Sequence, residues 1–88
     1  MVNNRRSEFE IIAEILSLSE SGAKSTEILY KGYMSYTQLK QYLPYLIEKE
    51  ILRETIIKNG NGSSKMYYTT DKGKELLVDI NKIFSYFK

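Results

Sequence analysis

The sequence predicts a mainly α-helical fold that includes one small β-hairpin. Four segments are expected to be helical: three place apolar residues three and four positions apart, which is the spacing of amphipathic helices, and the second, shorter one has the adjacent apolar pair Ile28 and Leu29. Between the third and fourth segments, two strand-like runs flank a stretch with two Asn-Gly pairs, which is a strong hairpin signal. The chain has 88 residues, so we expect residues 1–88 to form a single domain.

Composition argues against several classes of protein. The chain contains no cysteine and no histidine, which excludes disulfides and removes the usual zinc ligands. It has no glycine-rich phosphate-binding motif and no evident pair of catalytic carboxylates. We therefore predict no catalytic residue, metal, cofactor or small-molecule ligand, and no enzymatic activity. No apolar run approaches the roughly 20 residues of a membrane span, so we expect a cytoplasmic protein without a membrane partner.

The first helix is predicted over residues 8–20. Ser7 and Glu10 are spaced as a capping box, and Gly22 is expected to end the helix in a left-handed conformation. The buried stripe begins at Phe9 and continues through Ile12, Ile15 and Leu16. The outer face is acidic, so this helix is expected to be a scaffold. Before it, residues 1–6 are expected to be flexible, and Arg5 and Arg6 are candidate phosphate contacts.

A second helix over 25–31 and a third over 36–49 are separated by a three-residue turn that starts at Gly32. Two helices joined by so short a turn form a helix-turn-helix unit. Ser35 and Gln38 are spaced as a capping box for the third helix. Pro44 lies inside that helix and is expected to bend it near residues 40–44, because proline removes a backbone donor. Two short helices separated by a break are the alternative.

The exposed side of the third helix has no carboxylate near its start. Polar and basic side chains there can bond phosphates and base edges, with no carboxylate to repel DNA, so we predict that this helix lies in a DNA groove. The candidate contacts are Ser35, Tyr36, Thr37, Lys40 and Gln41. Gln41 suits an adenine edge, and Lys40 suits a guanine or a phosphate. An ordinary amphipathic surface helix is the alternative interpretation of this segment alone.

The hairpin is predicted from strands at residues 52–57 and 66–70. The long connection between them is expected to have a mobile tip. Its candidate contacts with DNA backbone or minor groove are Lys58, Asn59, Asn61 and Lys65, with Lys31 as a possible flanking phosphate contact. A plain solvated hairpin is the alternative.

The last helix is predicted from about residue 71 to 87, with Thr70 and Asp71 at its start. Its apolar stripe is too extensive to leave bare on a monomer of this size. Part of the stripe is expected to cover the core, and the distal part, from Ile80 to Phe87, to meet a second subunit. The predicted dimer contacts are Leu76, Ile80, Ile83, Phe84 and Phe87.

The order of elements resembles a winged helix-turn-helix domain. Residues 35–52 have the form S-Y-x-Q-L-x-x-Y-L-x-x-L-x-E-K-x-x-L, which is similar to the recognition helix of that family. Residues 68–77 resemble the last ten positions of the motif Y-x-L-T-x-K-G-x-x-L-L, which follows the wing. The whole pattern is most similar to small archaeal winged-helix proteins of about ten kilodaltons that bind DNA in chromatin.

This resemblance implies a nucleoid-associated homodimer, joined by antiparallel C-terminal helices in residues 71–88, that presents two recognition helices to double-stranded DNA. Two departures matter. Glu50 stands where the family usually has glycine, so a left-handed cap is not expected there, and the last helix is short for the family's dimer rod. Regulation of transcription and packaging of chromatin both remain open. A winged helix that binds another protein is the alternative function.

Overall fold

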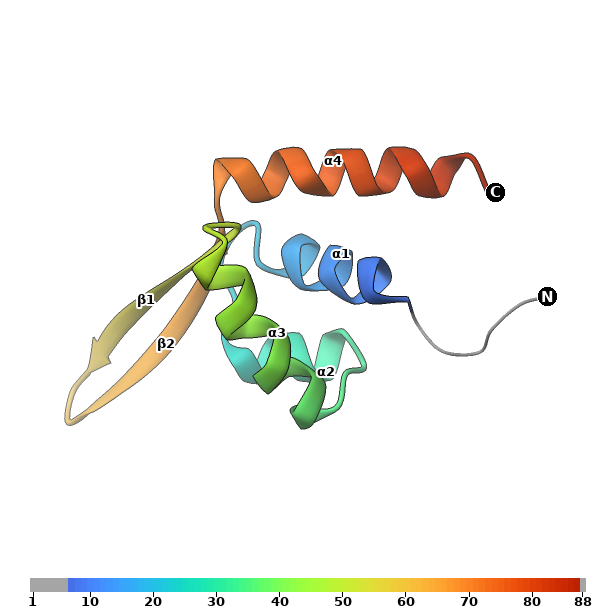
Figure 1. The fold of residues 1–88 in the computed structure, drawn as a ribbon. Helices are drawn as coiled ribbons and strands as arrows, with labels where there is room; N and C mark the ends of the chain where they lie inside the picture. Colours follow the sequence, from blue (N-terminus) through green and yellow to red (C-terminus); the bar gives the residue numbers. More distant parts are fainter. Residues whose placement is uncertain (1–6, 88) are drawn as a thin grey trace.

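The computed structural model describes residues 7–87, so the candidate contacts Arg5 and Arg6 lie outside the described residues. Four helices surround the base of a two-stranded antiparallel hairpin, as the sequence predicted (Figure 1). The elements are α1 (Glu8–Leu18), α2 (Ser25–Lys31), α3 (Tyr36–Glu48), β1 (Leu52–Asn59), β2 (Gly62–Thr69) and α4 (Asp71–Ser85). Within this range no helix has the length and apolar character needed to cross a bilayer.

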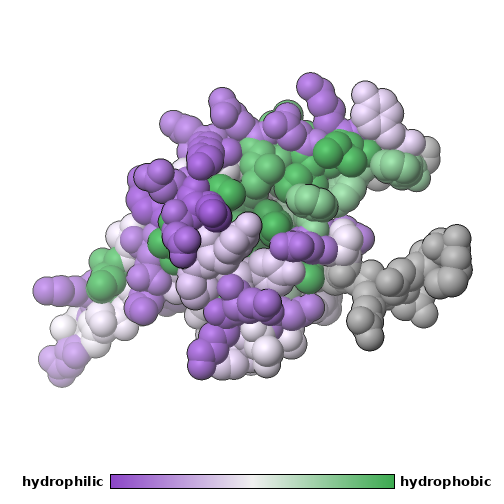
Figure 2. Space-filling view, viewed as in Figure 1, coloured by the Kyte–Doolittle hydropathy of each residue, from purple (hydrophilic) through white to green (hydrophobic). Residues whose placement is uncertain are grey.

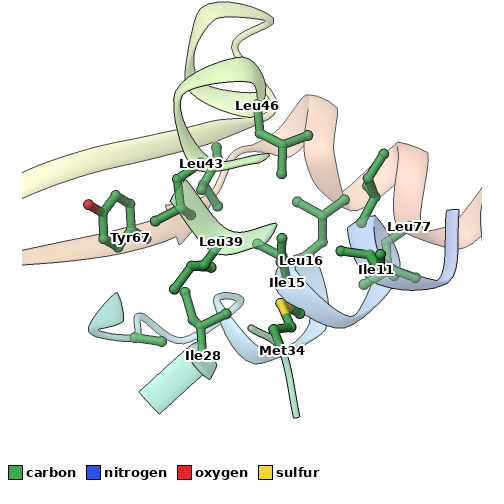
Figure 3. Packing of buried hydrophobic residues seen from close by; sticks show 14 of the residues in the cluster. Ile11, Ile15, Leu16, Ile28, Met34, Leu39, Leu43, Leu46, Tyr67 and Leu77 are labelled. Carbon is green, nitrogen blue, oxygen red and sulfur yellow. The ribbon is translucent and has the colours of Figure 1, made fainter. Parts of the chain in front are cut away.

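One hydrophobic core joins all of these elements. In Figure 3, Leu39, Leu43 and Leu46 of α3 point toward the side chains of α1, and Ile28 of α2 closes the core from below. Figure 1 shows α1 between α4 on one side and the α2–α3 pair on the other. Consequently α4 lies on one side of the molecule, while the first turn of α3 lies on the opposite side.

Helix α1 is shorter than predicted. It ends at Leu18 with Ser19 as its cap, because the Ser19 carbonyl accepts a hydrogen bond from the Thr69 amide of β2 at 3.0 Å. Gly22 does have a positive φ of 98°, but in the turn that follows the helix. Phe9 was predicted to be buried and is exposed, since it lies at the border of the stripe.

Helix α3 is one continuous helix through Pro44, so the alternative of two short helices is wrong. Its predicted bend is a finer detail that stays a prediction. The capping box is confirmed: the Gln38 amide donates to the Ser35 hydroxyl at 3.0 Å, and the Ser35 amide donates to the Gln38 side chain at 3.1 Å.

Both α2 and α3 end in a Schellman motif built on a residue other than glycine. After α3, the Ile51 amide donates to the Leu46 carbonyl at 2.9 Å, and the Glu50 amide donates to the Ile47 carbonyl at 3.0 Å. Glu50 has a φ of 61°, so the expectation that it would avoid a left-handed conformation was wrong. The paired hydrogen bonds and the burial of Leu46 hold the backbone in this conformation.

The same motif follows α2. The Met34 amide donates to the Leu29 carbonyl at 3.2 Å, and Tyr33 takes the left-handed position with a φ of 51°. Gly32 was expected to terminate α2, and it is the C-cap, but its φ is −87°. It is needed for close packing instead, because a Cβ there would meet the Ile28 carbonyl and the Met34 side chain.

The hairpin is longer and tighter than predicted. Its strands pair up to Asn59 opposite Gly62, which leaves only the two-residue turn Gly60-Asn61. The expected long connection was wrong, because polar side chains continue a backbone ladder as well as apolar ones do. Gly60 has a φ of 58°, a conformation that glycine adopts without strain. The ladder carries the hairpin tip away from the core (Figure 1).

The base of the hairpin is tied to the scaffold by hydrogen bonds that the sequence did not suggest. Ala23 and Tyr67 form an isolated antiparallel bridge, with amide-to-carbonyl distances of 3.0 and 2.8 Å. The Thr69 hydroxyl donates to the Leu16 carbonyl at 2.6 Å. These contacts fix where the hairpin leaves the body of the domain.

Helix α4 begins as predicted, with the Thr70 hydroxyl accepting from the Gly73 amide at 3.0 Å. The division of its apolar residues between the core and the exposed surface differs from the prediction. Ile80 is 3% exposed and belongs to the core of the single chain, because this side of α4 packs along α1. Leu76 and Phe84 are partly buried, whereas Ile83 is 56% and Phe87 is 85% exposed.

Candidate nucleic-acid interface

The predicted contact residues of α3 all lie at its exposed start. Tyr36, Thr37, Lys40 and Gln41 are exposed, because Leu39, Leu43 and Leu46 turn the opposite side of the helix into the core. Ser35 is also exposed, but its hydroxyl serves as the N-cap acceptor. The Lys40 ammonium lies 5.9 Å from the centre of the Tyr36 ring, within range of a cation–π interaction.

A groove of about 650 Å³ separates α3 from the hairpin. It brings together Tyr36 and Lys40 of α3 and Lys65 of β2, three of the predicted contact residues. Its floor consists of apolar side chains from α3 together with the Tyr67 ring, which Figure 3 shows beside Leu39 and Leu43. The groove therefore has an apolar floor and cationic groups from both of its walls.

Two glutamates that were not among the predicted site residues also line this groove. Glu48 lies at the end of α3 and Glu54 on β1. The Glu54 carboxylate is 3.9 Å from the Lys65 ammonium, so Lys65 already has an anionic neighbour. Helical spacing from Gln41 and Pro44 places Glu48 on the exposed side of α3, a signal available in the sequence. Glu54 becomes a neighbour of Lys65 only through the strand register.

Burial raises the pKa of Tyr67 to about 12, and a hydrogen bond to Glu54 and the charge of that carboxylate add to the effect. Tyr67 thus stays neutral, with its hydroxyl available to hold the Glu54 carboxylate on this wall of the groove. The side chains of Tyr67, Glu54 and Lys65 form a connected polar row along one side of the hairpin.

Gln41 does not line this groove. It lies beside Tyr42 and Tyr45 in a separate concavity of about 370 Å³, which Glu8 of α1 also lines. Burial and the nearby charge of Glu8 raise the pKa of Tyr42. A carboxylate therefore lies near Gln41, and sequence spacing could not reveal it because Glu8 comes from a different helix.

The remaining predicted contacts are dispersed. Lys58, Asn59 and Asn61 are exposed at the far end of the hairpin. Lys31 is exposed at the end of α2, where its ammonium is 3.9 Å from the Glu27 carboxylate. Across residues 7–87, no three His, Cys, Asp or Glu side chains gather as a metal site would require.

This fold is of the winged helix-turn-helix class. It has the three helices α1 to α3, the tight turn between α2 and α3, and the hairpin that follows. The family model described as winged helix-turn-helix matches residues 5–88, and the chain belongs to this family.

Three comparisons illustrate the relationship. The structure is similar to Sso10a-2, a DNA-binding protein from Sulfolobus solfataricus, with a TM-score of 0.82 and 26% identity over 92% of this chain and 81% of that one. It shares its fold with a PadR family transcriptional regulator from Eggerthella lenta, with a TM-score of 0.79 and 17% identity over 88% of this chain and 73% of that one. An uncharacterized Methanocaldococcus jannaschii protein is 30% identical over 81 residues, which is 91% of this chain.

The chain spans about a third of the length of that last relative, 35%. The predicted resemblance to archaeal winged-helix proteins is confirmed by these matches.

Proposed function

We propose that this protein binds double-stranded DNA, with the first two turns of α3 in the major groove and the hairpin against the backbone or minor groove. The observation that carries this proposal is the groove between α3 and the hairpin that joins Tyr36 and Lys40 to Lys65. Lys40 on one wall and Lys65 on the other can each meet a phosphate of a strand that enters between helix and wing, and Glu48 and Glu54 bring the net charge of the groove lining to zero. The DNA-binding relative Sso10a-2 supports the same conclusion.

Specific roles follow from side-chain chemistry. Lys40 contacts a phosphate or a guanine edge, and Gln41 reads an adenine edge. Lys58, Asn59, Asn61 and Lys65 contact the backbone or minor groove, and Arg5, Arg6 and Lys31 contact flanking phosphates. Lys65 exchanges Glu54 for a phosphate, a small loss because exposed ion pairs contribute about 0–1 kcal/mol.

We further propose that the protein is a homodimer joined through α4. Ile83 and Phe87 are exposed and Leu76 and Phe84 partly buried. Figure 2 shows apolar side chains gathered along the distal half of α4. Such a dimer presents two copies of α3 to one duplex, as a cytoplasmic, non-enzymatic regulator of transcription or a nucleoid protein does.

The test of DNA binding is fluorescence anisotropy with a labelled random duplex at low salt. The double variant Lys40→Ala, Gln41→Ala is expected to weaken binding by at least tenfold, because it removes one cation and one base contact. The matched control, Lys74→Ala with Asn81→Ala, removes the same kinds of exposed side chains from α4 and is expected to bind as wild type does. Equal binding by both double variants would place the interface elsewhere.

Specific and nonspecific competitor duplexes distinguish the two biological roles. A regulator is expected to prefer its own site by about a thousandfold or more over random DNA. A packaging protein is expected to show little preference.

A further inference from the structure

Three exposed tyrosines lie at and beside the turn between α2 and α3: Tyr30 in the last turn of α2, Tyr33 in the turn itself, and Tyr36 at the start of α3. Tyr30 is 75%, Tyr33 is 90% and Tyr36 is 68% exposed. The Tyr33 amide donates to the Tyr30 carbonyl at 3.4 Å, so these two residues are held close together. All three come from seven consecutive residues at the end of the molecule away from α4 (Figure 1).

Tyr33 is the most informative of the three. It occupies the left-handed position of the Schellman motif after α2, with a φ of 51°, where glycine is the usual residue. A side chain in this conformation lowers stability relative to glycine. With 90% of its surface exposed, the ring recovers little of that loss through packing. A strained residue that packs against little is reason to look for a function.

The surroundings of these rings favour an anionic partner. From residue 21 to residue 47 the chain has three lysines, Lys24, Lys31 and Lys40, and a single acid, Glu27, while Glu14 of α1 adds a second acid beside the turn at Gly32. The ion pair between Lys31 and Glu27 is long, at 3.9 Å, and exposed, so Lys31 can exchange it for a phosphate at small cost. A protein partner would need a broader apolar surface, and Figure 2 shows that surface along α4.

Exposed aromatic rings interleaved with cations are the features that bind single-stranded nucleic acid, because bases stack on the rings and phosphates meet the cations. We propose that Tyr30, Tyr33 and Tyr36 form a stacking platform for the unpaired bases of a single strand, with Lys31 and Lys40 contacting its phosphates. This activity is additional to duplex binding; it shares Tyr36 and Lys40 with the duplex interface proposed above, whereas Tyr30 and Tyr33 belong to it alone.

The first test uses two labelled single strands of the same length in fluorescence anisotropy: an oligothymidine of about 12 nucleotides and its abasic counterpart, which keeps the phosphates and lacks the bases. Stacking predicts that oligothymidine binds at least tenfold more tightly, since each stacked base contributes about a factor of ten. Equal affinity for both strands would show phosphate contact alone and would overturn the proposal.

The second test separates the contribution of the Tyr33 ring to binding from its effect on the stability of the fold. Tyr33→Gly is expected to raise the Tm by a few degrees, because glycine suits the left-handed backbone, and to weaken oligothymidine binding about tenfold. Tyr33→Phe keeps the ring and is expected to bind as wild type does. Tyr86→Ala removes an equally exposed tyrosine from the end of α4 and is the matched control.

The proposal fails if Tyr33→Gly binds oligothymidine as wild type does, or if it loses duplex and single-strand binding to the same extent. Duplex affinity is measured in parallel with the same preparations. A wild-type protein that binds oligothymidine but no duplex would contradict only the function proposed above.

Discussion

At the scale of one residue, Glu50 shows how tertiary structure overrides the preference of residues with a side chain for negative φ. A left-handed conformation costs about 1–2 kcal/mol for a residue with a side chain, and glycine recovers most of it after its own entropic cost. We expect Glu50→Gly to raise the free energy of unfolding by about 0.5–1 kcal/mol in urea denaturation.

Glu48→Gly is the control for this prediction. It makes the same change two residues earlier, at the last residue of α3, where the backbone is helical, and is expected to lower the free energy of unfolding by up to about 1 kcal/mol. Two changes of the same sign would contradict the assigned conformation of Glu50.

Tyr67 makes stability depend on pH at the alkaline end. Its pKa is raised to about 12 in the folded state, from an ordinary value near 10, first by burial and then by Glu54. Below about pH 10 the stabilisation is fully present, and it is lost as the pH rises through the folded pKa, because the unfolded chain releases the proton earlier.

Tyr67→Phe is therefore expected to show a smaller loss of stability between about pH 10 and about pH 12 than wild type, measured by urea midpoints. Tyr86→Phe changes an exposed tyrosine and is expected to keep the wild-type pH dependence. The same pH dependence in Tyr67→Phe as in wild type would refute this role.

At the scale of elements, Gly73 lets the start of α4 pack closely against the chain that follows α3. The motif after the wing contains this glycine, but the sequence alone did not show why it is needed. A Cβ on Gly73 would overlap the Ile51 carbonyl oxygen and press on the Thr69 methyl group. Backbone cannot move aside as a flexible side chain can. We expect Gly73→Ala to destabilise the protein by about 1–3 kcal/mol, although alanine is the better helix former.

The comparison is with Gly62→Ala in the hairpin, where only the Asn59 carbonyl lies within 4 Å of the new Cβ. This variant is expected to stay within about 0.5 kcal/mol of wild type in the same denaturation experiment. If both variants were neutral, the tight contact at Gly73 would be wrong.

The helices and the hairpin were predictable because their signals are local. The capping box at Ser35, the apolar spacing of α3 and the Asn-Gly pairs each operate within a few residues. The errors arose where distant parts of the chain decide the outcome. Helix α1 ends early because Thr69 bonds Ser19, and Glu50 adopts its cap because Leu46 and Ile51 are held by the core.

For the candidate contact residues, the sequence could predict exposure but not the neighbouring side chains. Helical periodicity correctly predicts that Tyr36, Thr37, Lys40 and Gln41 are exposed. It could not place Glu8 beside Gln41 or Glu54 beside Lys65, since those neighbours depend on how α1 packs and on the strand register.

At the scale of the whole molecule, the exposed end of α4 leads to a prediction about assembly. Phe87→Asp with Ile83→Asp is expected to shift the protein from dimer to monomer in analytical ultracentrifugation, because it places charges on the apolar surface. Val78→Asp also adds a charge to an exposed apolar residue, but helical spacing puts it on the opposite side of α4, and it is expected to remain dimeric. A wild-type protein that stays monomeric at high concentration would contradict the dimer.

The central claim is that α3 and the hairpin bind the phosphate backbone of duplex DNA, and the salt dependence of duplex affinity tests it most directly. Affinity is expected to fall linearly on logarithmic axes, with a slope of about 0.9 for each phosphate neutralised, and Lys40→Ala is expected to reduce that slope by about one unit. Lys74→Ala on α4 is expected to leave the slope unchanged. Affinity that does not change with salt, or equal slopes for wild type and Lys40→Ala, would contradict the account.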